Sequence, residues 1–230
     1  MGRFAKPQLI AENLPKDTAA NDAQEAAVWL AVQMGTPLSV HADFEFDQNS
    51  SLANIAKESE VELIGASDSL DDTDADFIIA SANDDCLVQQ VLAQLKQSAM
   101  IVRAGLDFYE EPMLLIVSDL SENSREAMDV VLTAGYLYDA RVHLLHLLDS
   151  EEQRDEHEPR LHDQLSSTDF RTLTYGLIVH VEVGTAAEVI PKFVADNDID
   201  LLVMGREFGS TDDTLQTLVT ETSCSVMLIQ

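Results

Sequence analysis

Short apolar runs alternate with amphipathic helical patterns in the second half of the chain. We expect strands near 113–118, 142–148, 178–183, 200–204 and 225–229, and helices near 122–138, 156–166, 185–197 and 211–222. The apolar runs are continuous, as in strands that are buried on both faces. Strands that alternate with helices in this way are typical of βαβ units. The pattern therefore predicts an α/β fold with a parallel, doubly wound sheet.

Two of the expected helices begin with a capping pattern. Asn123 is followed three residues later by Glu126, and Ser210 is followed in the same way by Asp213. A polar residue with an acid three positions on is typical of a helix start. We therefore expect Asn123 and Ser210 to cap the helices that follow them.

The first half of the chain repeats the pattern of the second. Residues 8–11 match 113–117, and residues 76–80 match 200–204, each with a helical pattern after it. The offset between the copies is about 105 residues early in the repeat and about 124 residues late. A repeat of this size predicts two related domains, residues 1–106 and residues 107–230, of which the first is shorter.

The shortening falls between the third and fourth strands of the first copy. The third strand is expected at Val61–Ile64, and residues 65–75 after it have no helical period. The second copy fills the matching link, residues 184–199, with regularly spaced apolar residues. A parallel crossover normally needs a dozen or more residues. The first domain is therefore predicted to lack one helix.

Five segments of the second half, in this order, resemble a universal stress protein domain. They are Leu114-Leu-Ile-Val-Ser-Asp119, Leu144-Leu-His146, Val183-Gly184-Thr-Ala-Ala-Glu188, Asp200-Leu-Leu-Val-Met204-Gly205 and Ser223-Cys224-Ser-Val226. The resemblance covers residues 110–230, and for residues 1–106 it depends on the internal repeat. It implies two tandem Rossmann-like (adenine nucleotide alpha hydrolase-like) domains, each with a five-stranded parallel sheet of order 3-2-1-4-5. The first would be a degenerate domain of the family.

The resemblance also implies a place for a ligand. In an open α/β sheet the crevice lies beyond the carboxyl ends of the strands where the strand order reverses. Nucleotide-binding members of the family place an acidic residue after the first strand, and a glycine-rich loop after the fourth. The candidate nucleotide-binding residues that match these positions are Asp119, Gly205, Arg206, Gly209 and Ser210.

The glycine-rich loop departs from the family pattern. Gly205 and Gly209 are separated by three residues, where the family has two. Asp212 and Asp213 stand where the family has glycine followed by serine or threonine. Two carboxylates at that place oppose a triphosphate. We therefore expect no tight ATP binding in the second domain and no resident cofactor, with ATP or AMP as the alternative.

The first copy has less of the nucleotide-binding pattern than the second. Its loop after the fourth strand, residues 80–86, contains no glycine, and Asn13 stands where the second copy has Asp119. We expect no nucleotide in the first domain.

Each candidate residue also has a structural explanation. Asp119 either contacts an adenine or caps the next helix, and Gly205 and Gly209 either line a ligand or form a turn. Arg206 is the nearby cation that is able to pair with a phosphate. Asp212 and Asp213 either chelate Mg²⁺ or complement a helix dipole, and we favour the dipole.

The histidines do not form an evident metal site. His143 and His146 are three apart on a strand, so they point to opposite faces and are expected in the core. His157 and His162 are five apart, which is poor helical spacing for a pair of ligands, so a solvated helix face is expected. No metal site is predicted.

Charge then limits the possible partners. The chain has 42 acidic and 13 basic residues, a net charge of −29. Such a surface repels nucleic acid and anionic membranes, so we expect neither as a partner. The chain shows no signal or spanning segment, which favours a cytoplasmic location.

The function expected from these observations is non-enzymatic. The sequence contains no nucleophile elbow, no phosphate-loop lysine and no HExxH motif, so no catalytic residue is assigned. We expect a universal stress protein that supports stress resistance through a protein or a small ligand. The alternative is an adenine-nucleotide switch or slow ATPase that uses the second domain.

The last strand of each copy is expected to be a sheet edge, and exposed edges favour pairing. These strands, 100–102 and 226–229, predict an intramolecular pseudo-dimer of the two domains. A homodimer and a further protein partner are possible additions.

Overall fold

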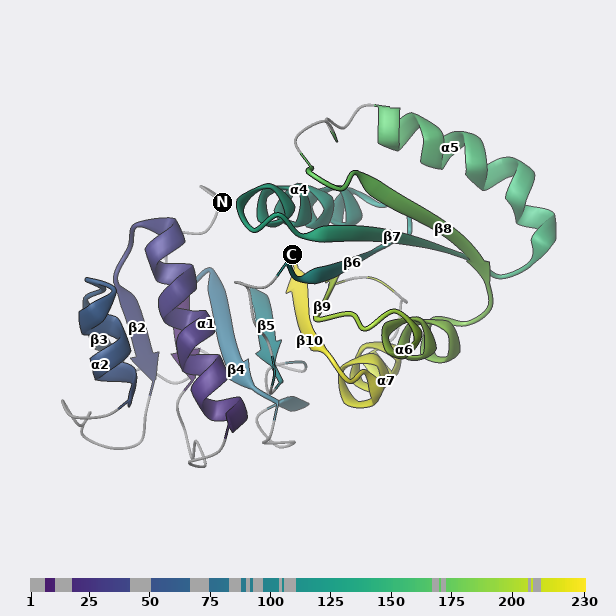
Figure 1. Cartoon of the computed structure of the whole chain (residues 1–230). Helices are drawn as coiled ribbons and strands as arrows, with labels where there is room; N and C mark the ends of the chain where they lie inside the picture. The colour runs from purple at the N-terminus through teal and green to yellow at the C-terminus, as the bar shows by residue number, and fades with distance from the viewer. Residues whose placement is uncertain are drawn as a thin grey trace. The chain divides into compact units, whose positions relative to one another are not determined.

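The chain divides into two compact units, residues 1–106 (unit 1) and residues 107–230 (unit 2). The computed structural model, drawn in Figure 1, describes residues 7–10, 18–41, 51–66, 75–82, 88–89, 92, 97–103, 105, 111–166, 170, 173–206, 208 and 212–230. No helix in these ranges combines the length and the apolar character needed to cross a bilayer.

Unit 1 contains a parallel sheet with the strand order β3-β2-β1-β4-β5. Its elements are β1 (Pro7–Ile10), α1 (Thr18–Met34), β2 (Leu38–His41), α2 (Ser51–Glu58), β3 (Leu63–Ala66), β4 (Phe77–Ser81) and β5 (Ser98–Val102). Helix α1 packs against the central strands β1 and β4 and also contacts α2. Strands β4 and β5 are buried along their whole length, as their continuous apolar sequence predicts.

The third strand of unit 1 begins two residues later than expected. The backbone N–H of Val61 donates to the carbonyl of Ala56 at 2.8 Å, so Val61 closes the end of α2. The expected loss of a helix concerns the link between β3 and β4. Most of that link, residues 67–74, lies outside the described residues.

Unit 2 contains a second parallel sheet, with the order β8-β7-β6-β9-β10. Its elements are β6 (Met113–Ser118), α4 (Glu122–Leu137), β7 (Arg141–Leu148), the 3₁₀ turn η2 (Glu151–Gln153), α5 (Arg154–Ser166), β8 (Leu177–Val183), α6 (Ala186–Asp196), β9 (Leu201–Gly205), α7 (Asp212–Glu221) and β10 (Ser225–Ile229). The predicted α/β fold with parallel strands is confirmed. Every expected strand and helix of the second half is present, within about two residues at each end.

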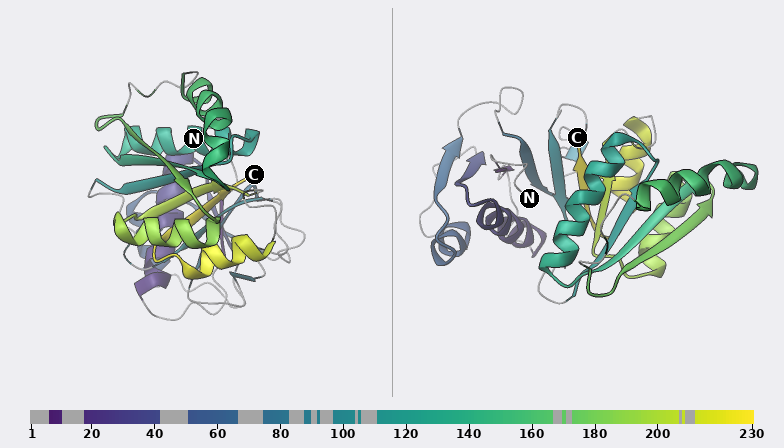
Figure 2. Two further views of the ribbon diagram at one scale, coloured as in Figure 1. Left: turned by 90° about the vertical axis from the view of Figure 1, so that its right-hand side faces the viewer. Right: turned by 90° about the horizontal axis from the view of Figure 1, so that it is seen from above.

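The helices of unit 2 cover both faces of its sheet. Helix α4 packs on one face against β6, β9 and β10, while α6 and α7 pack against each other on the opposite face (Figures 1 and 2). Strands β9 and β10 are buried along their whole length. At the amino end of the sheet, the Asp200 carboxylate accepts a hydrogen bond of 2.7 Å from the backbone N–H of Met113. The first residues of β6 and β9 are thereby held together.

The capping residue of α4 differs from the prediction. Ser121, not Asn123, precedes the helix with an extended backbone, and its side chain accepts a hydrogen bond from the N–H of Ser124. Asn123 already lies in the first turn of α4, so the prediction was wrong by two residues. The predicted cap at Ser210 lies outside the described residues.

The carboxyl end of β9 lies very close to the first turn of α4. A Cβ atom on Gly205 would be 2.9 Å from Cβ of Asn123, 3.2 Å from the Asn123 carbonyl carbon and 3.4 Å from the Ser124 nitrogen. Two of these three atoms belong to the backbone, which cannot rotate away. Only glycine permits this approach of β9 to α4.

We predict that Gly205→Ala destabilises unit 2 by about 1–3 kcal/mol, because the new methyl group overpacks the contact with α4. The matched test is a double-mutant cycle with Asn123→Gly, which removes the nearest atom. Urea unfolding of the four proteins should show a smaller loss for Gly205→Ala in the Asn123→Gly background. Equal losses in both backgrounds would contradict the close contact.

Candidate functional site

The candidate site lies where the strand order of unit 2 reverses. The chain passes from the central strand β6 to β7 on one side, and β9 pairs with β6 on the other. The helices that follow β6 and β9, α4 and α7, lie on opposite faces of the sheet (Figure 1). This arrangement leaves the ends of β6 and β9 as the usual ligand position of an open α/β sheet.

Asp119 is the first residue after β6, and its carboxylate binds the turn into α4. Its Oδ1 atom accepts a hydrogen bond of 2.9 Å from the backbone N–H of Ser121 and a second, short one from the Ser124 hydroxyl. The N–H of Asp119 donates to the same hydroxyl at 3.2 Å. Leu120, between them, has a φ of 65°, which a non-glycine residue adopts only under constraint. Ser121 is the cap of α4, and Asp119 holds the turn before it through these hydrogen bonds, which favours the structural one of the two roles considered.

The electrostatics of Asp119 fit the same role. Burial alone would raise the pKa of the Asp119 carboxyl, but the hydrogen bonds from Ser121 and Ser124 outweigh it. The pKa therefore lies below its ordinary value of 3.8. The carboxylate is held ionised, as an acceptor at the start of a helix should be.

Gly205 and Arg206 form the beginning of a tight turn. The carbonyl of Gly205 accepts a hydrogen bond of 3.0 Å from the N–H of Phe208, and the Phe208 side chain is buried. The N–H of Arg206 donates to the Ile229 carbonyl at 2.8 Å. Gly205 thus takes part in the turn that follows β9, and the role of Arg206 toward a phosphate stays a prediction. Gly209 and Ser210 lie outside the described residues.

The described residues at this end of the sheet contact one another closely. The space that Gly205 leaves by lacking a side chain is filled by the first turn of α4, and Oδ1 of Asp119 is occupied by the turn into α4. Asp212 and Asp213 are the first two residues of α7, in agreement with the helix-dipole explanation.

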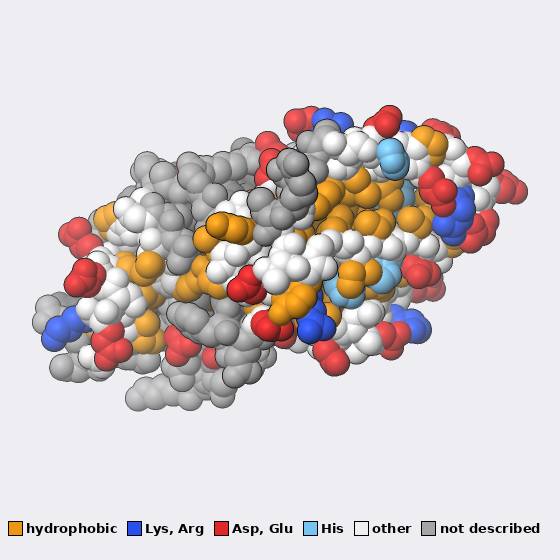
Figure 3. Space-filling model, turned by 45° about the horizontal axis from the view of Figure 1, so that its top comes forward, with side chains coloured by type: hydrophobic (Ala, Val, Ile, Leu, Met, Phe, Trp, Pro, Cys, Tyr) orange, Lys and Arg blue, Asp and Glu red, His pale blue; other side chains and the backbone are white. Residues whose placement is uncertain are grey.

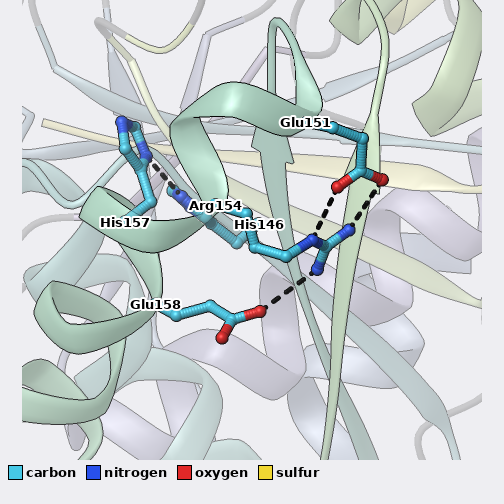
Figure 4. A network of polar contacts seen from close by, with 5 residues as sticks. All are labelled: His146, Glu151, Arg154, His157 and Glu158. Carbon is cyan, nitrogen blue, oxygen red and sulfur yellow. Dashed lines mark hydrogen bonds and ion pairs between the residues drawn. The ribbon is translucent and has the colours of Figure 1, made fainter.

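A histidine pair lies beside this turn and was not predicted. Nδ1 of His146 is 2.7 Å from the carbonyl oxygen of Ser118, so the ring donates there. Nε2 of the same ring is 2.9 Å from Nδ1 of His157, on α5 (Figure 4). The Ser118 hydroxyl donates to the Gln164 side chain of α5 at 3.3 Å. The pair therefore ties α5 to the carboxyl ends of β6 and β7.

This tie matters because α5 has few other contacts with the sheet. Leu161 and Gln164 are its buried residues. The guanidinium of Arg154 instead pairs with Glu151 at 2.7 Å and with Glu158 at 3.2 Å, all on the outer surface (Figure 4). Exposed pairs of this kind contribute little to stability.

A second histidine pair lies on the opposite face of the sheet. Nδ1 of His143, on β7, is 3.1 Å from Nε2 of His180, on β8, and both rings contact the edge of Phe193 in α6. His143 and His146 therefore do point to opposite faces and are buried, as predicted from their spacing. No group of three or more side chains suited to a metal ion occurs among the described residues.

The buried histidines are held neutral. Burial lowers the pKa of His143, and the neighbouring His180 lowers it further. Burial also lowers the pKa of His146 by more than the Ser118 carbonyl and Asp119 raise it. Burial likewise lowers the pKa of His180, against the opposing effect of Glu182. With His146 neutral, Nδ1–H donates to Ser118, and Nε2 accepts from His157.

We predict that Asp119→Ala lowers the free energy of unfolding of unit 2 by about 1–2 kcal/mol at neutral pH, since the hydrogen bonds from Ser121 and Ser124 that hold the turn into α4 are lost. The control is Asp129→Ala, an exposed acid of the same helix, which should change little. The stabilisation by Asp119 is complete above pH of about 4 and is lost as the pH falls through the lowered folded-state pKa. Urea unfolding between pH 7 and pH 2.5 should show that acid loss in the wild type and a smaller one in Asp119→Ala.

The histidines predict a second pH dependence. Below the ordinary pKa of 6.5, the unfolded chain takes up protons that the native His143, His146 and His180 resist. The free energy of unfolding should therefore fall as the pH is lowered from about 7.5 to about 5. Above that range, the stabilisation that the neutral histidines give is fully present. His146→Leu should reduce this slope, whereas Leu144→Val, a buried change without a charge, should lower stability at all pH values alike. An unchanged slope in His146→Leu would contradict the assignment.

The chain was compared with known proteins. The family model described as "Universal stress protein family" matches residues 113–230. Among curated protein sequences, none matches.

Solved structures share the fold. A universal stress protein structure from Pseudomonas aeruginosa is 14% identical, with a TM-score of 0.70 over 99% of this chain and 94% of that one. One from Archaeoglobus fulgidus is 11% identical, with a TM-score of 0.65 over 97% and 96%. A third, the universal stress protein from Archaeoglobus fulgidus in complex with dAMP, is 18% identical and covers 53% of this chain and 99% of its own, with a TM-score of 0.44.

The family match extends from β6 to β10, and so includes the turn at Asp119 and the approach of Gly205 to α4. Since the match covers more than half of the chain, the protein belongs to the universal stress protein family.

Proposed function

We propose that this chain is a non-enzymatic, cytoplasmic universal stress protein that supports stress resistance by binding a protein or a small ligand, and that it does not bind ATP tightly. The observation that carries the proposal is the contact of Gly205 with the first turn of α4, which fills the space beside the glycine. The hydrogen bonds of Asp119 support it, because the carboxylate that would face an adenine is engaged in the turn.

Charge supports the proposal independently. Asp212 and Asp213 replace the glycine and hydroxyl residues that the resemblance implies for the phosphates. Unit 2 as a whole has 25 acidic and 7 basic residues after position 106. A polyanionic triphosphate approaches such a surface against repulsion, which is strongest at low salt.

The pairing of the two units through β5 and β10 remains part of the proposal. Each of these strands is the last in the strand order of its own unit. Each unit thus has one strand edge, at β5 or β10, that is suited to pair with another strand.

We predict that calorimetric titration of the intact protein with ATP, with and without Mg²⁺, gives no binding at micromolar concentrations. The informative variant is the double change Asp212→Gly and Asp213→Ser, which removes two negative charges and restores the family's residue types. It should gain affinity for ATP relative to the wild type, by about tenfold if each charge contributes about 0.7 kcal/mol.

AMP is titrated in parallel, as the ligand of lower charge. Micromolar ATP binding by the wild type that is lost in Arg206→Ala would overturn the proposal in favour of the nucleotide switch or slow ATPase. Absence of binding in the wild type with a gain in the double variant would support it.

A further inference from the structure

The outer edge of β8 is the least covered part of the unit 2 sheet. Ile178 is 46% exposed, Val179 is 42% exposed and Val183 is 38% exposed, whereas β9 and β10 are buried throughout. Strand β8 pairs with β7 on one side, and among the described residues no strand of unit 2 pairs with its other side. In Figure 3, apolar side chains gather close to histidines, with acidic side chains around them.

The backbone of β8 offers hydrogen bonds along this edge. Gly184 donates its N–H to the carbonyl of Leu148, on β7, at 2.9 Å. Because alternate residues of a parallel strand direct their backbone groups to opposite sides, those of Glu182 also point toward β7. The N–H and C=O groups of Val179, Val181 and Val183 therefore point outward, as a template for another strand.

The side chains of β8 differ between its two faces. Val179 and Val181 are in register with Leu144 and His146, so the valines of β8 continue the apolar face that carries α4. On the other face, Ile178 and His180 are followed by the exposed acid Glu182. A strand added at this edge would meet apolar side chains on one face and a negative charge on the other.

An aromatic group extends the same edge beyond the amino end of β8. Tyr175 is 44% exposed, and the Arg141 guanidinium carbon lies 5.0 Å from the centre of its ring. Arg141 also pairs with Glu111 at 3.8 Å. Exposed tyrosine beside arginine is the composition that recurs in the energetically important parts of protein interfaces.

Charge decides between possible occupants. A second copy of this chain would bring a net charge of −29 to a surface of the same sign. Cations beside the edge already have acidic partners, Arg141 with Glu111 and Lys192 with Asp196. The acids around β8 therefore favour a positively charged partner.

We propose that the outer edge of β8 binds an extended segment of another protein, in which apolar residues that face Val179, Val181 and Val183 alternate with lysine or arginine. Backbone hydrogen bonds to β8 would supply affinity, and the alternation would supply specificity. The inference rests on the proposed role in binding a protein. Its test is separate, because ATP titration reports on the crevice and peptide binding reports on β8.

The test uses a labelled nine-residue peptide of alternating lysine and valine, titrated into the intact protein at about 0.1 M NaCl, where charges are only partly screened. The wild type should bind it, and a peptide of alternating glutamate and valine should not bind. Val179→Pro removes an outward N–H without touching the bonds to β7, and should weaken binding by tenfold or more. The matched control Val179→Thr keeps the N–H and the branched shape, and should stay within about threefold of the wild type.

Two further measurements keep the proposal falsifiable. If Val179→Pro fails to fold by circular dichroism, Glu182→Lys replaces it and should weaken binding of the lysine peptide while allowing the glutamate peptide to bind. If the wild type binds the lysine peptide no more tightly than Val179→Pro, or than Glu182→Lys where that variant replaces it, the attraction is non-specific and the proposal is overturned. Absence of binding by the wild type would also overturn it. A wild-type dimer in sedimentation that is lost in Val179→Pro would also overturn it, because the occupant would then be a second copy.

Discussion

The turn between β6 and α4 is the constraint on which the rest of unit 2 depends. The chain has to leave a strand that is buried on both faces and begin a helix after only three residues, Asp119 to Ser121. Within that turn the polar groups bind one another, although the Asp119 side chain itself is exposed. The Asp119 carboxylate accepts a hydrogen bond from the Ser124 hydroxyl, which itself accepts one from the N–H of Asp119. Leu120, the next residue, has a positive φ that a non-glycine residue seldom adopts.

The two histidine pairs join α5 and β8 to strand β7. Strand β7 sends one ring to each face, where it meets His157 from α5 or His180 from β8. Burial lowers the pKa of His143, His146 and His180, which favours the neutral form of these three rings. Asp119 and these histidines thus respond to pH in different ranges, because the pKa of Asp119 lies below 3.8 and the pKa values of the histidines lie below 6.5.

The sequence predicted the parts of unit 2 that depend on local patterning. Strands such as β6 and β9 were found because both of their faces are buried, which leaves a continuous apolar run. The cap of α4 was placed at Asn123 because Asn123 and Glu126 form as good a local pattern as Ser121 and Ser124. The choice between them depends on the Asp119 carboxylate, whose direction is set by the end of β6. Local spacing carries no such information.

The contact of His157 with His146 could not be predicted for a related reason. His157 lies in α5 among charged residues, which is typical of a solvated helix face. Nothing in the neighbouring sequence indicates that His157 has a partner on β7. The partner is fixed by where α5 crosses the carboxyl ends of the strands. Among the candidate site residues, Asp119, Gly205 and Arg206 were correctly placed at the ends of β6 and β9, since strand order determines these positions. Gly209 and Ser210 remain predictions.

The close approach at Gly205 changes how a glycine in such a motif can be understood. Here the missing side chain makes room for the protein's own backbone, so any larger residue would harm folding whether or not a nucleotide is ever bound. Selection for a stable fold alone would therefore be enough to keep this glycine. A glycine that belongs to a ligand-binding pattern can thus be required by packing, independently of any ligand.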